Sequence, residues 1–169
     1  MARGWSSLPA ILTRVGTGYD VVLFLHLVGA LLFVAGITVA GVGFEAARRR
    51  DRPAEIALLL GIARAGVPLV VVGGLLLPVF GLWLVHLGAF GYGSAWVDAS
   101  IALYAVALTL GGFGGRRPRQ ARQLATQLAA EAAPLSGELR ELLDDPVARM
   151  ANYGSLALVL VILALMVFK

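Results

Sequence analysis

Residues 21–44 read VVLFLHLVGALLFVAGITVAGVGF, an apolar stretch whose one ionisable side chain is His26. At about 1.5 Å per residue this stretch makes roughly 36 Å of helix, enough to cross a bilayer. Backbone polar groups in lipid must be paired internally, so the stretch is predicted to be a transmembrane helix. An ionisable side chain inside such a helix is costly, which makes His26 a candidate functional residue.

Three more stretches have the same character, and we expect them to span the membrane at 66–88, 95–113 and 151–168. Of the 169 residues, 59% are hydrophobic and 14% are charged. A soluble domain usually carries about 25% charged residues. We therefore predict a single all-α integral membrane domain over residues 1–169, an antiparallel up-and-down four-helix transmembrane bundle. Residues 1–18 are expected to be interfacial or flexible.

Two basic connections, 45–65 and 114–150, hold 11 of the 14 basic residues. The positive-inside rule places both in the cytoplasm, with both termini outside, as in a protein of the bacterial cytoplasmic membrane. The second connection contains short amphipathic helices, one of which follows Ser136 as a helix cap. Because the basic residues gather between apolar stretches, we expect lipid rather than nucleic acid as the partner. The arginines expected to contact anionic headgroups are Arg48, Arg49, Arg50, Arg116, Arg117 and Arg119.

Small residues recur along one side of the first two stretches, at spacings of three and four residues. This pattern lets helix backbones approach closely in membranes. Pro78 interrupts the second stretch and should kink it, because proline lacks an N–H group. The stripes serve contacts within a chain or between chains equally well, so a homo-oligomer stays open. The glycines expected to pack helices are Gly29, Gly36, Gly43, Gly74 and Gly81.

His26 and His86 are the two histidines, and both fall toward the outer end of their helices. Together they could bind haem b or copper. The alternatives are structural: His26 hydrogen-bonds a carbonyl of a neighbouring helix, and His86 reaches the interface beside Trp83. Asp98 opens the third stretch, where it suits the helix dipole or completes an outer polar cluster with a histidine.

The chain lacks the residues that several kinds of chemistry require. The chain has no cysteine, and no acidic residue lies deep in an apolar stretch, which disfavours ion-coupled transport. No spacing suggests a Ser-His-Asp triad, a phosphate loop or a zinc motif, so no catalytic residue is assigned.

The segments YDVVLFLHLVGALLFVAGI, ARAGVPLVVVGGLLLPVFGLW, WVDASIALYAVAL and ALMVFK resemble a bacterial family of four-span integral membrane proteins of unknown function. The first of these segments, with His26 and Gly29, is also similar to copper resistance D-like proteins and to four-helix membrane protoporphyrinogen oxidases. Those likenesses imply a metal or haem role for His26. The oxidases also use an intramembrane lysine, whereas the one lysine here is Lys169.

These observations leave three interpretations of function. The first is a non-enzymatic membrane protein, such as an accessory or assembly factor. The second is a haem- or copper-binding redox or metal-handling protein that uses His26. The third is a pathway for small solutes, which the nearly uncharged stretches disfavour.

Overall fold

The computed structural model describes residues 8–87 and 95–168, with side chains described from residue 18 onward. All regular structure in these ranges is helical. Four helical stretches are long and apolar enough to cross a membrane, namely Gly18–Arg48, Pro53–Leu87, Ala95–Ala130 and Gly137–Val167. The helices are α1 (Leu8–Arg48), α2 (Pro53–Leu87), α3 (Ala95–Gly114), α4 (Arg116–Ala130), α5 (Gly137–Asp144) and α6 (Pro146–Val167).

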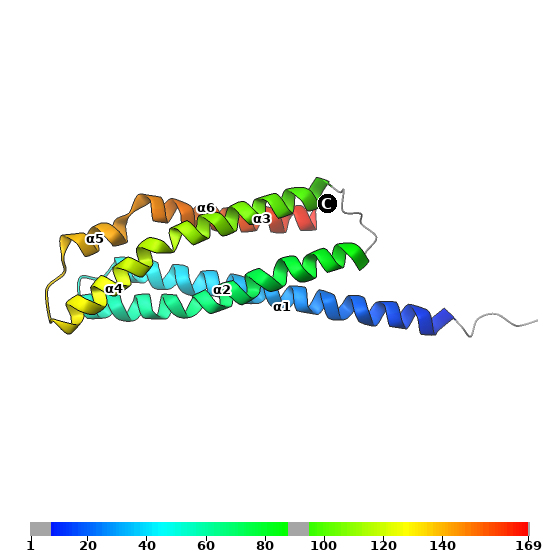
Figure 1. Ribbon diagram of the computed structural model, residues 1–169, viewed down its shortest axis with the longest axis horizontal. Coiled ribbons are helices and arrows are strands. Elements are labelled where there is room, and N and C mark those ends of the chain that lie inside the picture. The colour runs from blue at the N-terminus through cyan, green and yellow to red at the C-terminus, as the bar shows by residue number, and fades with distance from the viewer. Residues whose placement is uncertain (1–7, 88–94, 169) are drawn as a thin grey trace, which may run out of the picture.

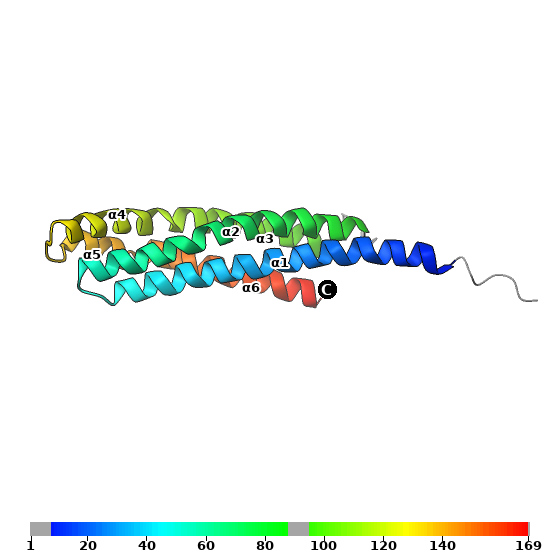
Figure 2. The same cartoon turned by 90° about the horizontal axis from the view of Figure 1, so that it is seen from below.

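The helices form two pairs that lie side by side (Figures 1 and 2). α1 packs along α2 in the opposite direction, with Gly29 beside Leu76 at one end and Gly43 beside Ala63 at the other. α3 packs against α6, and α4 crosses to α2. Backbone contacts are dense within each pair, whereas α3 and α6 have few with α1 and α2. The two pairs are therefore joined mainly at the end that carries α4 and α5.

The connection between the first two helices is short. α1 continues to Arg48 and α2 begins at Pro53, so the basic connection 45–65 is mostly helix, and 54–64 extends the second span, as its apolar pattern indicates. Proline is favoured in the first turn of a helix, and the alanine- and leucine-rich segment after it continues the helix. Ser136 caps α5 as expected, since its hydroxyl accepts a hydrogen bond from the Leu139 N–H at 3.2 Å.

The best-buried core lies where the ends of α1 and α2 meet α4 and α5, and we call this region the cap. The apolar faces of α4 and α5 turn inward onto the other helices, and Leu139 and Leu143 are fully buried. An amphipathic helix buries its apolar face against whatever apolar surface is available. The cap core consists of Phe44, Ala47, Ile56, Leu60, Ala121, Ala125, Leu139, Leu142 and Leu143.

Arginine–carboxylate pairs tie the helices of the cap together. Arg48 pairs with Asp144 at 2.8 Å, and Arg117 pairs with Asp145 at 2.9 Å. Arg140 donates to the Arg48 carbonyl at 2.9 Å, near the C-terminus of α1. Four of the six arginines expected at lipid headgroups thus have acidic partners within the protein, namely Arg48, Arg49, Arg50 and Arg117.

Candidate functional site at the proline kink of α2

Glycines hold α1 and α2 at close range. A Cβ atom added at Gly36 would lie 2.6 Å from the Val70 nitrogen and 2.8 Å from the Gly66 carbonyl oxygen. On α2, Gly66 and Gly73 face α1 in the same way, and Gly73 lies against the backbone of Phe33. The sequence reasoning missed Gly66 and Gly73. Their spacing of seven matches that of Gly29, Gly36 and Gly43, which is the signal that could have identified them.

His26 points from α1 toward α2. Its Nδ1 lies 3.1 Å from the Leu77 carbonyl oxygen, and the ring is half-buried. Gly81 leaves room for the ring, because a Cβ there would come within 3.1 Å of the His26 Cε1. When Nδ1 donates its proton to a carbonyl, the lone pair of the neutral ring is on Nε2.

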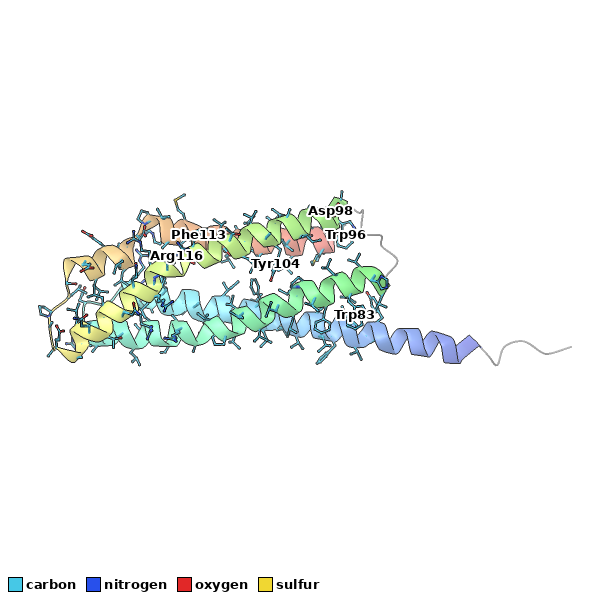
Figure 3. All side chains as sticks on the ribbon, in the orientation of Figure 1. Trp83, Trp96, Asp98, Tyr104, Phe113 and Arg116 are labelled. Atoms are coloured by element: carbon cyan, nitrogen blue, oxygen red, sulfur yellow. The ribbon has the colours of Figure 1, made fainter. Side chains whose placement is uncertain are left out.

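Tyr104 supplies the hydrogen bond that Pro78 removes. Pro78 lies inside α2 and has no N–H, so the Gly74 carbonyl four residues earlier loses its helical partner. The Tyr104 hydroxyl donates to that carbonyl. Figure 3 shows Tyr104 projecting from α3 into the space between the two helix pairs. Its ring also meets Phe33, with centroids 6.3 Å apart.

Three helices therefore converge on the kink. His26 comes from α1 and Tyr104 from α3, and they reach two carbonyls of α2 that lie three residues apart. We call the set His26, Gly74, Leu77, Pro78 and Tyr104 the kink site. The sequence indicated a lost hydrogen bond at Pro78 and singled out His26, whereas the bond from Tyr104 is a finding of the structure. An unpaired carbonyl in a membrane helix requires a donor, which the sequence alone does not assign to a particular residue.

The other predicted site residues lie elsewhere. His86 is exposed near the end of α2, and it is five positions beyond Gly81, which faces His26. Five positions turn a helix by about 140°, so His86 leaves α2 on a different side. Asp98 is exposed in the first turn of α3, and Figure 3 shows it at the end of the molecule, beyond Tyr104. Over residues 8–87 and 95–168, no three His, Cys, Asp or Glu side chains are placed to share a metal.

Long apolar helices, close glycine contacts and polar side chains bonded to neighbouring backbones define a polytopic α-helical membrane protein. Residues 20–169 match the family described as "Predicted integral membrane protein (DUF2269)", and the chain belongs to this family. Comparison with curated proteins and with solved structures finds no match.

A double-mutant cycle tests the link between Tyr104 and Pro78. We expect Tyr104→Phe to lower the free energy of unfolding by about 1 kcal/mol, because the Gly74 carbonyl loses its donor. In a Pro78→Ala background the loss should shrink, since residue 78 then offers its own N–H to Gly74. Unfolding of the purified protein in detergent measures both values. The exposed Tyr153→Phe is the control, and equal losses from Tyr104→Phe in both backgrounds would contradict the link.

Proposed function

We propose that the protein is a non-enzymatic membrane accessory or assembly factor that presents its cap to a partner protein. One observation carries this proposal. A shallow, open groove of about 420 Å³ lies between α4 and α5, and polar side chains from both helices line it. Glutamine carries both a donor and an acceptor, the combination needed to pair with a peptide backbone. The groove is lined by Arg117, Gln120, Gln123, Leu124, Gln127, Glu138 and Leu142.

The polar groups of the spans support the same proposal. His26, Tyr104 and Ser155 each bond a carbonyl of a neighbouring helix, the last of them to Ala107 at 3.2 Å. Such bonds join helices within the membrane. The membrane half then acts as a support for the cap, whose groove remains available to a partner.

Site-specific photocrosslinking in native membranes tests the accessory role. A photoreactive residue at Gln123 should give one discrete adduct with a second polypeptide, and Gln120→Ala together with Gln127→Ala should abolish it. The control position is Leu58, which is 66% exposed on the cap and does not line the groove. The proposal is wrong if Gln123 gives no protein adduct, or if Leu58 gives the same one.

A second candidate function, haem binding through His26, is favoured by the bond between Nδ1 and the Leu77 carbonyl. Histidines that ligate metals commonly donate their other ring nitrogen to a carbonyl, which fixes the ring and leaves Nε2 to coordinate. Protein purified from haem-replete cells should then show a Soret band that His26→Ala abolishes and His86→Ala leaves in place. A colourless preparation would remove this candidate.

We also propose that the cap faces the cytoplasm of a bacterium and that both termini face outward. The support is the concentration of arginine in and beside the cap. Single cysteines at positions 50 and 169 report the two sides. A membrane-impermeant thiol reagent added to whole cells should label position 169 and spare position 50, and labelling of position 50 would reverse the orientation.

A further inference from the structure

Two sets of residues mark levels about one bilayer apart. Trp83 in α2 and Trp96 in α3 lie at the end of the molecule opposite the cap (Figure 3). Tryptophan is enriched where lipid meets water. Arg64 precedes Trp83 by about 28 Å of helix, and Arg116 follows Trp96 by about 30 Å, at 1.5 Å per residue. The hydrocarbon core of a bilayer is about 30 Å thick, so both arginines lie at its other boundary.

Arg149 of α6 lies at the same level. A Cβ at Gly114 would lie 3.3 Å from the Ala151 Cβ and 3.7 Å from the Ala148 carbonyl oxygen. Arg149 therefore lies in the turn of α6 beside Gly114, and Gly114 precedes Arg116 by two residues. We call Arg64, Arg116 and Arg149 the boundary arginines. The cap core begins about one turn further on, at Leu60 and Ala121.

The boundary arginines differ from Arg48, Arg117 and Arg140 in their partners. Arg48, Arg117 and Arg140 each pair with a carboxylate. Within the part of the chain that the structure describes, none of the boundary arginines forms an ion pair.

Large apolar side chains surround the boundary arginines. Phe113 is 58% exposed, and the Arg116 guanidinium lies over its ring at 4.7 Å. Ile62, near Arg64, and Met150, beside Arg149, are also exposed. These side chains are suited to acyl chains, so the three guanidinium groups lie at the level where lipid phosphates are available.

We propose that Arg64, Arg116 and Arg149 bind the phosphate groups of anionic phospholipids at the membrane boundary beneath the cap. Guanidinium presents a planar set of donors that matches phosphate, and the bonds are charge-assisted. Arg49, which the sequence also suggested, is 77% exposed but lies 3.5 Å from Glu45, which competes with a lipid phosphate. The inference does not depend on the accessory role, because lipid binding here uses the boundary and not the groove.

Spin-label EPR of the full chain in phosphatidylcholine vesicles tests this proposal. The measured quantity is the preference of the protein for motionally restricted phosphatidylglycerol over phosphatidylcholine. Each basic residue near a membrane surface contributes about 1 kcal/mol, which corresponds to about fivefold in association. We expect the triple variant R64Q/R116Q/R149Q to lose most of this preference. Salt at about 0.5 M should weaken the preference of the wild type, because it screens the charges.

Two matched variants keep the outcome decisive. R49Q/R52Q/R122Q removes the same charge from the cap and should retain the preference. R64K/R116K/R149K keeps the boundary charge and should retain most of it, which separates loss of charge from misfolding. The proposal is overturned if the boundary glutamine variant keeps the wild-type preference, or if the cap variant loses as much.

Discussion

Replacing Gly36 with alanine should lower the free energy of unfolding by about 2 kcal/mol or more, because α1 and α2 must move apart. The added Cβ would lie 2.6 Å from the Val70 nitrogen and 2.8 Å from the Gly66 carbonyl oxygen. Both are backbone atoms, so no side-chain rotation relieves the clash. Unfolding of the purified protein in detergent, followed by helical circular dichroism, measures the loss.

Gly41 provides the matched control, since it lies in the same helix and nothing is within 4 Å of its added Cβ. Gly41→Ala should be neutral or stabilising by up to about 1 kcal/mol, because alanine has the higher helix propensity. If Gly36→Ala and Gly41→Ala change stability equally, then the glycine stripe of α1 does not set the distance between α1 and α2.

The two glycine stripes illustrate what local pattern can predict. The stripe of α1 could be recognised in the sequence because Gly29, Gly36 and Gly43 recur every seven residues. On α2 the glycines fall at 61, 66, 73, 74 and 81, and two overlapping stripes fit the spacing rule. Which stripe faces α1 depends on the rotation of α2, and only the packing of the helices determines that. Gly74 consequently meets both Phe33 of α1 and Tyr104 of α3.

Only part of the kink site could be predicted from the sequence. Proline chemistry alone indicates that α2 loses a hydrogen bond at Pro78. The donor comes from α3, and its position follows from how the second helix pair sits against the first. That placement is set by the cap, far from Tyr104 along the chain, so no local pattern encodes it. The predicted spans were recognisable for the opposite reason, since apolar length is a local property.

The cap was not predicted, because an amphipathic helix has the same sequence pattern whether its apolar face meets lipid or protein. The sequence indicated short amphipathic helices within 114–150 and the capping role of Ser136. It could not show that Leu139 and Leu143 meet Phe44 and Ile56, which lie more than eighty residues away. Lipid and a protein core are similarly apolar, so hydrophobicity does not distinguish these two partners.

Replacing Leu143 with alanine should separate the two possibilities. In a packed cap the variant leaves a cavity, and the free energy of unfolding should fall by about 2–5 kcal/mol. The side chain is fully buried among residues of α1, α2 and α4. Hydrogen exchange of the α4 and α5 amides should rise correspondingly, because local opening becomes easier. Both effects should be the same in detergent and in lipid vesicles.

Leu58→Ala is the control within the same cap, since Leu58 is 66% exposed and leaves no cavity. We expect it to cost less than about 1 kcal/mol, as substitutions away from buried packing usually do. A helix pair lying on the bilayer would behave differently, because truncating Leu143 would then weaken attachment to vesicles and leave the stability in detergent nearly unchanged. Equal effects of Leu143→Ala and Leu58→Ala would mean that α5 does not close a protein core.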